Sequence, residues 1–313
     1  MTYGVERCSG LRRGVSYETE FTDDFIGLLL QLPHGRGGGD LLPAYSSCDN
    51  RGKTGMNRDL FELTGKTALI TGASRGIGLA IARAYGRAGA RLAISSESYD
   101  DCQQIAALLV GEGIDAWPVK ADLAAHSEVE GLAAAVRAQF GGLDALVCNA
   151  GVAPHMGPLA TASDLDWETT MTVNLRSALW LTTALVPSMV ARGGGSVVLI
   201  ACIAGVRGNR SLGLYGLSKA ALAQLARNLA VEWGPSNIRV NAISPGVIQT
   251  EFARPLTDSP ALMQKRLALT PLRRAGIPDE VAGLALLLAG PAGGFITGKN
   301  LIVDGGTTIG DGN

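Results

Sequence analysis

Short, continuously apolar runs alternate with longer stretches of helical periodicity from Leu63 onward. Runs without polar alternation are expected of strands that are buried on both faces of a parallel sheet. Strands that alternate with helices favour right-handed crossovers, so we predict an α/β fold with a doubly wound, seven-stranded parallel sheet. The predicted strands are Thr67–Thr71, Arg91–Ser95, Ala116–Lys120, Asp144–Cys148, Ser196–Ala201, Ile238–Ile243 and Asn300–Val303. The predicted helices cover residues 76–88, 99–112, 126–140, 163–191, 214–234 and 278–289.

Residues 1–58 lack this alternating pattern. They contain a glycine-rich patch at Gly35–Gly39 and scattered arginines with no sustained hydrophobic period, which is typical of disordered segments. We predict that they form a disordered extension and that residues 59–313 form one domain. An alternative is that translation begins at Met56, in which case nearly all of the extension belongs to an upstream start-site assignment.

Composition narrows the range of functions. The chain has 42 glycines and 47% hydrophobic residues, enough apolar side chains for a full core. Its net charge of −1 argues against electrostatic binding to nucleic acid or to an anionic membrane surface. No apolar run approaches the roughly 18 residues that a membrane span needs. The five cysteines show no CxxC pair and no metal-ligand spacing, so we expect reduced thiols in a cytoplasmic protein without a metal site.

The first predicted strand continues into a glycine-rich turn that opens the first predicted helix. Its sequence is Thr71-Gly72-Ala73-Ser74-Arg75-Gly76-Ile77-Gly78. Glycines permit the tight turn and let backbone N–H groups approach a pyrophosphate, and the helix N-terminus adds a partial positive charge. A turn between a strand and a helix is the context that a dinucleotide-binding loop requires, although three residues between the first two glycines differ from the common GxGxxG spacing.

A tyrosine and a lysine lie four residues apart in the predicted helix over residues 214–234, as Tyr215-Gly216-Leu217-Ser218-Lys219. On a helix this spacing places both side chains on one face. A free tyrosine hydroxyl has a pKa of about 10, and a neighbouring ammonium group is expected to lower the pKa of Tyr215. Tyr215 could then exchange a proton with an alkoxide or an alcohol at neutral pH, although a surface Tyr–Lys pair shows the same spacing.

Together the glycine turn and the tyrosine–lysine pair resemble the motifs of the short-chain dehydrogenase/reductase family, in its small single-domain type. Further segments match the family's motifs in the same order along the chain: Asp122 in Ala121-Asp122-Leu123, then Cys148-Asn149-Ala150-Gly151, Asn174 in Thr172-Val173-Asn174-Leu175, Pro245-Gly246 followed by Thr250, and Val303-Asp304-Gly305-Gly306. The resemblance covers residues 63–306. It implies a Rossmann-type fold, an NAD(P) cofactor, and hydride transfer to or from a carbonyl or alcohol carbon.

The resemblance also implies roles for individual residues. Tyr215 would be the acid–base, Lys219 would lower its pKa and hold the nicotinamide ribose, and Asn174 would position a water that relays protons from Lys219. The predicted catalytic residues are Asn174, Cys202, Tyr215 and Lys219. The predicted cofactor-binding residues, besides Tyr215 and Lys219, are Gly72, Ser74, Arg75, Gly76, Ile77, Gly78, Ser96, Glu97, Asp122, Leu123, Asn149, Ala150, Gly151, Pro245, Gly246, Ile248 and Thr250.

Cys202 is where the chain departs from the family's pattern. Family members usually carry a serine thirteen residues before the catalytic tyrosine, and Ala201 replaces a second expected serine. A thiol is a weak hydrogen-bond donor, and the loss of a good oxyanion donor costs about 10²–10³ in rate. Three interpretations follow. Cys202 is a weaker donor in a working reductase, the chain binds a dinucleotide with little or no catalysis, or Cys202 acts as a reactive thiol beside Lys219.

Signals for the type of dinucleotide conflict. Arg75 lies in the glycine turn, where a basic residue can pair with an adenosine 2′-phosphate. Ser96 stands at the end of the second strand, where NAD enzymes commonly carry an aspartate for the 2′-hydroxyl. Glu97 follows it and would repel a phosphate. These residues slightly favour NADP(H) over NAD(H).

The segment Glu251–Arg274 resembles the family's substrate lid, and Arg210, His155 and Met156 are candidates to line the pocket beneath it. We refer to Glu251–Arg274 as the lid. An apolar pocket closed by a mobile helix suits a small-molecule substrate.

The leading interpretation is a carbonyl reductase or alcohol dehydrogenase of the 3-oxoacyl-reductase kind. The alternative is a dinucleotide-binding protein without significant turnover, which acts as a sensor or an assembly partner. The predicted helices over residues 163–191 and 214–234 resemble those that pair subunits in the family, and so a homotetramer or a homodimer is expected.

Overall fold

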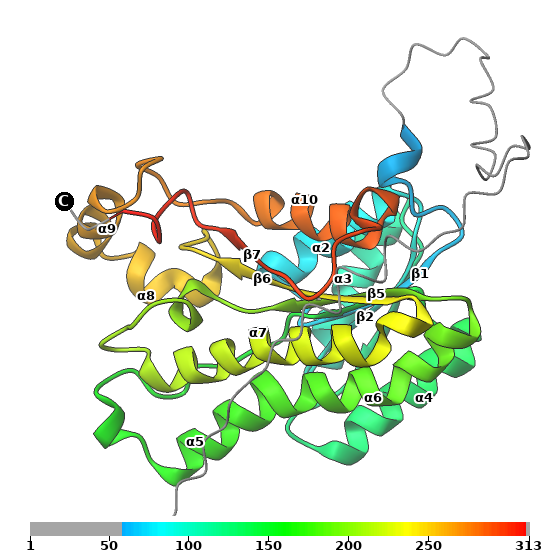
Figure 1. Cartoon of the computed structure of the whole chain (residues 1–313), viewed down its shortest axis with the longest axis horizontal. Helices are drawn as coiled ribbons and strands as arrows, with labels where there is room; N and C mark the ends of the chain where they lie inside the picture. The colour runs from blue at the N-terminus through cyan, green and yellow to red at the C-terminus, as the bar shows by residue number, and fades with distance from the viewer. Residues whose placement is uncertain (1–57, 311–313) are drawn as a thin grey trace, which may run out of the picture. The chain divides into compact units, whose positions relative to one another are not determined.

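A seven-stranded parallel sheet forms the centre of the computed structural model, which describes residues 58–310 (Figure 1). The strand order is β3-β2-β1-β4-β5-β6-β7, and every neighbouring pair is parallel. The predicted doubly wound sheet is therefore confirmed. The strands are β1 (Thr67–Thr71), β2 (Arg91–Ser96), β3 (Ala116–Lys120), β4 (Ala145–Cys148), β5 (Gly195–Ile200), β6 (Ile238–Pro245) and β7 (Asn300–Val303).

The predicted extension falls almost entirely outside the described residues, which begin at Arg58. Its predicted disorder, the hypothesis of a start at Met56, and the division between residues 1–58 and 59–313 therefore stay predictions.

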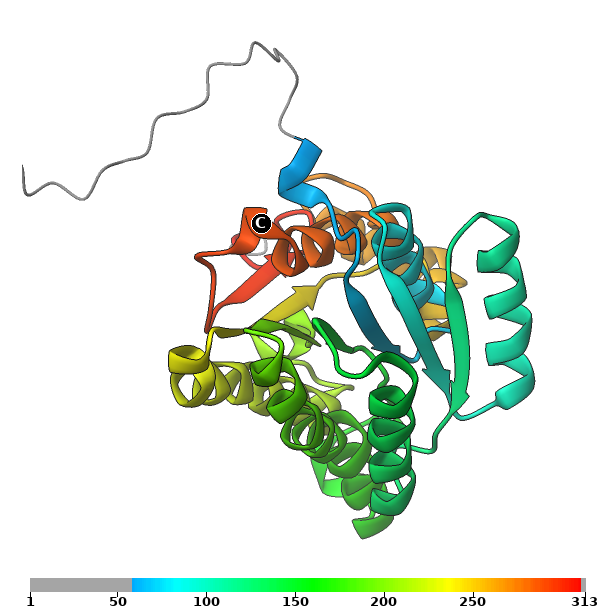
Figure 2. The same ribbon diagram turned by 90° about the vertical axis from the view of Figure 1, so that its right-hand side faces the viewer.

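Helices cover both faces of the sheet (Figure 2). One face carries α2 (Gly76–Arg87), α3 (Tyr99–Gly111) and α10 (Pro278–Ala289). The other face carries α4 (His126–Phe140), α6 (Ser177–Ala191) and α7 (Gly213–Trp233). The shorter helices are α5 (Asp164–Met171), α8 (Arg254–Thr257) and α9 (Pro260–Ala268).

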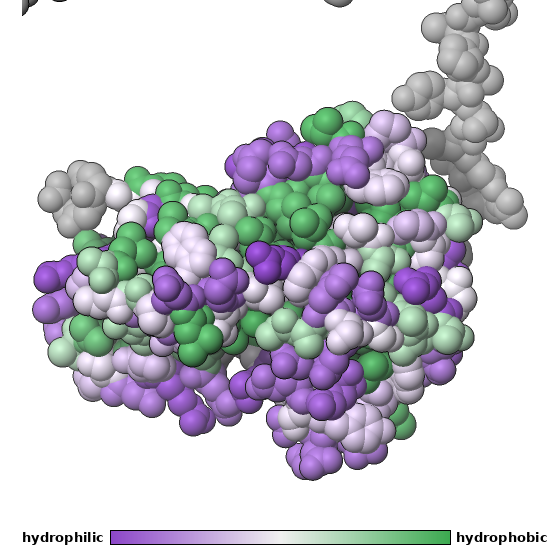
Figure 3. Space-filling model, turned by 90° about the horizontal axis from the view of Figure 1, so that it is seen from below, coloured by the Kyte–Doolittle hydropathy of each residue, from purple (hydrophilic) through white to green (hydrophobic). Residues whose placement is uncertain are grey.

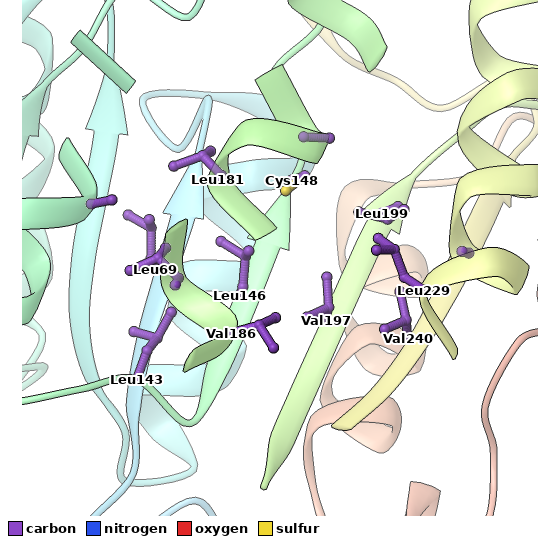
Figure 4. Close-up of a cluster of buried hydrophobic side chains, with 14 of the residues drawn as sticks. Leu69, Leu143, Leu146, Cys148, Leu181, Val186, Val197, Leu199, Leu229 and Val240 are labelled. Atoms are coloured by element: carbon purple, nitrogen blue, oxygen red, sulfur yellow. The ribbon is translucent and has the colours of Figure 1, made fainter. Parts of the chain in front are cut away.

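The side chains of the central strands form the core because each strand is buried on both faces. Figure 4 shows one of the two clusters, in which Leu146 of β4 and Val197 of β5 lie beneath Leu181 of α6. All three side chains are fully buried. On the opposite face, Tyr85 of α2 is also fully buried, and its hydroxyl donates a hydrogen bond of 2.9 Å to the carbonyl oxygen of Ala285 in α10. Both helix layers are thus fixed against a rigid sheet.

The predicted helix over residues 163–191 is confirmed as one helical run, with an irregularity that the sequence did not reveal. The chain forms α5, then a π-helical turn over Thr172–Arg176, and then α6. A π turn adds one residue to the helical repeat, which hydrophobic periodicity does not reveal. Asn174 lies inside this turn and is 2% exposed.

The sheet topology determines where a ligand could bind. β1 lies between β2 and β4, so the chain direction of the crossovers reverses at β1. In open α/β sheets the crevice at such a reversal, beyond the carboxyl ends of the strands, is the usual binding site. The glycine turn after β1 and the Asn149 turn after β4 meet there.

Candidate active site

A cleft of about 830 Å³ lies beyond the carboxyl ends of the strands, at the point where the strand order reverses. Two predicted site residues do not line it, namely Gly78 and Asn174, which are buried behind its wall. The predicted residues that line it are Gly72, Ser74, Arg75, Gly76, Ile77, Ser96, Glu97, Asp122, Leu123, Asn149, Ala150, Gly151, Cys202, Tyr215, Lys219, Pro245, Gly246, Ile248 and Thr250.

The glycine turn is held in place by side-chain and backbone contacts that leave no room for larger residues. A Cβ atom at Gly78 would lie 2.2 Å from the carbonyl oxygen of Gly72, so α2 approaches the turn as closely as it does only with glycine there. The Asn149 amide donates hydrogen bonds of 2.9 Å to the carbonyl oxygens of Thr71 and Gly72. The first turn of α2 carries no acidic residue, so its backbone N–H groups and dipole are free for an anion. This arrangement fits a dinucleotide pyrophosphate.

Charged side chains surround the part of the cleft near the end of β2. Glu97 and Asp101 line it together with Arg75. Nε of Arg75 lies 3.6 Å from a carboxylate oxygen of Glu251, and both side chains are more than half exposed. The Ser96 hydroxyl donates a hydrogen bond of 3.0 Å to the carbonyl oxygen of Ser98. The glycine turn and the lid therefore meet through an ion pair, which the sequence did not reveal.

Tyr215 and Lys219 lie side by side in α7, at the inner end of the cleft. Lys219 Nζ donates a hydrogen bond of 2.8 Å to the carbonyl oxygen of Ile200 and lies 5.5 Å from the centroid of the Tyr215 ring. Both residues are buried, with Lys219 2% exposed and Tyr215 7% exposed. Burial lowers the pKa of the Lys219 ammonium to about 8, and the sulfur atoms of Cys202 and Cys148 partly oppose this shift.

The expected lowering of the Tyr215 pKa is not found. Burial raises the pKa of this hydroxyl well above its ordinary value, and the charge of Cys202 and a hydrogen bond with its side chain raise it further. Removing the phenolate from water disfavours the charged form of the side chain. At neutral pH the Tyr215 hydroxyl therefore keeps its proton, and it can act as an acid.

Cys202 occupies the position beside Tyr215 that the resemblance implies for a hydrogen-bonding serine. Its sulfur accepts a hydrogen bond of 3.4 Å from the backbone N–H of Ala204 and lies near enough to the Tyr215 hydroxyl to raise the pKa of that hydroxyl. The 3-10 turn over Ile203–Gly205 packs directly on α7, since a Cβ atom at Gly216 would lie 2.5 Å from the carbonyl oxygen of Ala204. This close approach holds the turn that follows Cys202 against α7, the helix that carries Tyr215.

Asn174 uses its side chain to hold the turn after β4 against α7. Its Oδ1 accepts a hydrogen bond of 2.7 Å from the backbone N–H of Val152. Its Nδ2 donates to the carbonyl oxygen of Val152 at 2.9 Å and to the Ser218 hydroxyl at 3.0 Å. The Ser218 hydroxyl in turn donates a hydrogen bond of 2.7 Å to the carbonyl oxygen of Tyr215. Asn174 is thus a neighbour of the site, and the predicted water relay stays a prediction.

The lid closes one side of the cleft with helices α8 and α9. The ring of Phe252 packs on Tyr215, with 5.8 Å between the ring centroids. Met156 lines the cleft as expected, whereas Arg210 and His155 do not. Sequence reasoning overlooked Arg207, which lines the cleft together with Arg266 of α9. Only the spacing of Arg207 from Cys202, five residues later, could have signalled it.

Known proteins match this chain over most of its length. A family model described as Enoyl-(Acyl carrier protein) reductase matches residues 72–308. The chain is 38% identical to Dehydrogenase/reductase SDR family member 4 of Bos taurus over 245 residues, which is 78% of this chain and 88% of the relative. The chain belongs to the short-chain dehydrogenase/reductase family. The predicted membership is confirmed, and with it the assignment to the oxidoreductases.

Other members of the family show the range of substrates. Galactitol 2-dehydrogenase (L-tagatose-forming) of Cereibacter sphaeroides is 38% identical over 262 residues, which is 80% of this chain and 98% of the relative. A crystal structure of a gluconate 5-dehydrogenase from Burkholderia cenocepacia, in complex with NADP and tartrate, superposes with a TM-score of 0.78 at 34% identity. That match covers 81% of this chain and 99% of the other chain.

Two further observations concern residues 58–310. None of their helices has the length and apolar character that crossing a membrane demands, and no group of three or more His, Cys, Asp or Glu side chains there could hold a metal ion. Cys102, Cys148 and Cys202 are all unpaired. Burial raises the pKa of the Cys148 thiol to about 12, so this cysteine stays protonated at neutral pH.

Proposed function

We propose that this member of the short-chain dehydrogenase/reductase family transfers a hydride between a nicotinamide dinucleotide and a carbonyl or secondary alcohol carbon. The observation that carries the proposal is that one cleft joins the glycine turn to Cys202 and to the buried Tyr215 and Lys219. The names of the relatives, including a galactitol 2-dehydrogenase, support a small hydroxylated or carbonyl substrate. Compounds of the 3-oxoacyl type are the first class to test.

The cofactor proposal rests on the fit of the glycine turn and on solved relatives. One relative was crystallised with NADP and another, a 7α-hydroxysteroid dehydrogenase at 35% identity and a TM-score of 0.77, with NADH. When bound, such a cofactor supplies or accepts the hydride. The turn Gly72–Gly78 would hold the pyrophosphate, Asp122 and Leu123 the adenine, and Lys219 the nicotinamide ribose.

In carbonyl reduction, Tyr215 would donate its proton to the substrate oxygen. Its raised pKa keeps the hydroxyl protonated for this step. The Lys219 ammonium, whose pKa is about 8, would be charged at neutral pH and would stabilise the phenolate left behind. Phe252 and the lid would exclude water from the reacting atoms, which strengthens these electrostatic interactions.

Cys202 is proposed to serve as a weaker hydrogen-bond donor to the substrate oxygen. Cys202 and Tyr215 line the same cleft, where that oxygen would bind. The pair Ala201–Cys202 provides no hydroxyl donor. This absence favours a second candidate function, a dinucleotide-binding protein with little turnover. A reactive thiol at Cys202 is the third interpretation, and it would show as alkylation blocked by substrate.

NADP(H) is proposed in preference to NAD(H), as the glycine turn carries Arg75 and β2 ends in Ser96. Glu97 and Asp101 oppose this preference, because their carboxylates line the same part of the cleft. The ratio of kcat/KM for NADPH and NADH decides between the two. A strong preference for NADH would overturn the proposal.

A cytoplasmic homotetramer or homodimer is also proposed. Helices α5, α6 and α7 expose large apolar side chains, among them Leu165 at 76%, Leu179 at 41% and Val231 at 81%. Such side chains commonly pack against another subunit. Apolar and polar surfaces lie next to each other on the face seen in Figure 3. The molar mass in solution, measured by light scattering, tests the assembly, and a monomer would contradict it.

The decisive experiment combines cofactor binding with turnover. Dinucleotide binding is measured by fluorescence, and oxidation of NADPH and NADH is followed over a panel of aldehydes, ketones, oxo acids and 3-oxoacyl thioesters. Turnover that disappears in Tyr215→Phe supports the enzyme. Binding without turnover on the whole panel supports the second candidate function.

A further inference from the structure

Two arginines face the substrate side of the cleft without a carboxylate partner. Arg207 lies in the loop after the turn Ile203–Gly205, and Arg266 lies on α9 of the lid. Both are partly buried. Among residues 58–310, neither guanidinium group takes part in an ion pair, whereas Arg254 beside them pairs with Glu251 at 3.8 Å. Positive charge is therefore left over in this part of the cleft.

The two guanidinium groups and the reacting site are close enough to act on one another. Burial lowers the pKa of Arg266, the like charge of Arg207 lowers it further, and Cys202 raises it. Two like charges that are partly removed from water repel each other, so the arrangement is unfavourable unless an anion binds between them. Arg207 and Arg266 line the same cleft as Cys202 and Tyr215, so the positive pair shares this cleft with the atoms proposed to react.

A hydrogen-bonded frame from the C-terminal segment holds the pair in place. Arg207 Nη1 donates a hydrogen bond of 3.1 Å to the carbonyl oxygen of Thr307. The Thr307 hydroxyl oxygen lies 2.9 Å from the Thr270 hydroxyl oxygen. The Thr270 hydroxyl donates a hydrogen bond of 2.9 Å to the carbonyl oxygen of Arg266. Both threonines are buried. Figure 1 shows this C-terminal segment (red) running beside the lid. The frame thus holds the Arg207 side chain and the backbone of Arg266.

The acidic residue of this segment cannot neutralise the pair. Both carboxylate oxygens of Asp304 accept hydrogen bonds of 2.8 Å, from the backbone N–H groups of Gly306 and Thr308. These contacts hold the carboxylate within its own turn. Since no carboxylate among residues 58–310 forms an ion pair with Arg207 or Arg266, both are available to an external anion.

We propose that the substrate is an oxo acid or hydroxy acid whose carboxylate binds to Arg207 and Arg266. The planar guanidinium group matches a carboxylate through two parallel N–H···O bonds, and such charged bonds are the strong ones. The inference rests on the proposed function, since it assumes that the carbonyl or alcohol end of the same molecule reaches Tyr215. It narrows the substrate class from carbonyl compounds in general to those with an anionic end.

The test compares acids with their methyl esters in binding, so that it does not depend on turnover. Acetoacetate, 4-oxopentanoate and 5-oxohexanoate are each titrated by calorimetry into the enzyme, with and without oxidised dinucleotide, alongside the corresponding methyl esters. At least one acid is expected to bind about 10- to 100-fold more tightly than its ester, because charged hydrogen bonds contribute about 1.5–3 kcal/mol. Equal affinities for every acid and ester, or no binding of any acid, would overturn the proposal.

A matched pair of variants on α9 assigns the effect to the cleft. Arg266→Gln is expected to abolish the preference for the acid, whereas Lys265→Gln, an exposed residue outside the cleft lining, keeps it. Arg207→Lys retains the charge but not the planar group, and it should reduce the preference about 3- to 10-fold. An unchanged preference in Arg266→Gln contradicts the assignment even if the wild type prefers acids.

The outcomes separate this inference from the proposed function. Acid binding through Arg266 without oxidation of NADPH or NADH supports the carboxylate site and removes the enzyme proposal. Equal kcat/KM for neutral ketones and oxo acids supports the enzyme and removes the inference. Tighter binding of dihydroxyacetone phosphate than of any oxo acid overturns the choice of a carboxylate in favour of a phosphate.

Discussion

The two halves of the cleft are built by different means. The dinucleotide half consists of strand ends and the glycine turn, where backbone groups, Asn149 and the fully buried strand β1 fix the geometry. The substrate half consists of long side chains on the lid, whose helices α8 and α9 have no buried residue. The first half is rigid and common to any dinucleotide, while the second half owes its chemistry to a few exchangeable side chains. Selectivity for the substrate is therefore carried by the part of the molecule that is least packed.

The chemistry between the halves should respond most strongly to loss of the acid–base. Tyr215→Phe removes the hydroxyl but keeps the ring that packs on Phe252. General acid–base catalysis contributes about 10²–10⁴, so kcat is expected to fall about 10³-fold while the dinucleotide Kd stays unchanged. Steady-state kinetics and fluorescence titration measure the two quantities. Tyr99→Phe, at an exposed tyrosine of α3, is the control that should change neither. Full activity in Tyr215→Phe would remove the proposed mechanism.

The next largest effect should come from Lys219 and depend on pH. The pKa of Lys219 is about 8 in the folded protein, below its ordinary value of 10.5. Between these values the unfolded chain holds a proton that the folded chain has released, so the free energy of unfolding rises with pH through this window. The difference of two and a half pKa units corresponds to a rise of about 3 kcal/mol in the free energy of unfolding across this window.

Lys219→Met should lack this rise, and denaturant unfolding of both proteins at pH 7 and pH 10.5 measures the difference. In the wild type, carbonyl reduction should fall as the pH passes about 8, since the ammonium is lost. Parallel stability profiles of wild type and variant would show that burial of Lys219 carries no such cost.

The rigidity of the dinucleotide half can be broken at one glycine. In Gly78→Ala the new methyl group would lie 2.2 Å from the carbonyl oxygen of Gly72. We expect a loss of about 1–3 kcal/mol in the free energy of unfolding and weaker dinucleotide binding. Gly131→Ala in α4 is the matched control, because nothing lies within 4 Å of its Cβ position, and alanine there should stabilise the helix by about 1 kcal/mol. Similar stability in the two variants would contradict the close packing.

Cys202→Ser should sharpen the contrast from the substrate side. A hydroxyl is a better donor than a thiol, so kcat for carbonyl reduction is expected to rise about 10-fold, a part of the 10²–10³ that a full oxyanion donor supplies. The variant also removes the sulfur whose charge raises the pKa of Lys219, so the fall in activity above about pH 8 should move to lower pH. No change in rate or substrate preference would refute the role of a weaker donor.

The smallest effect is expected where the two halves touch. Glu251→Gln releases Arg75 from an exposed ion pair, a contact worth less than about 1 kcal/mol. The KM for NADPH should fall by about 2- to 5-fold, and that for NADH should stay the same. Glu168→Gln on α5, outside the cleft lining, is the control. An equal change for both cofactors would show that Arg75 does not contact the 2′-phosphate.

The sequence predicted the dinucleotide half more fully than the substrate half, for a physical reason. Strand β1 and the glycine turn follow from local hydrophobic pattern and spacing, and the predicted bounds Thr67–Thr71 match the structure. The pair Arg207–Arg266 depends on contacts between segments far apart in the chain, joined through Thr307. The direction of the Tyr215 pKa shift was predicted wrongly because it depends on burial, which spacing along a helix does not report.

The frame through Thr270 and Thr307 joins the lid to the end of the chain. Helices α8 and α9 have no buried residue and are expected to open at little cost in free energy, whereas the buried Thr270 ties the end of the lid to Thr307. We therefore expect opening of the lid to be coupled to the segment around Thr307. For protein engineering, changes in this segment offer a route to altered selectivity without touching the catalytic side chains.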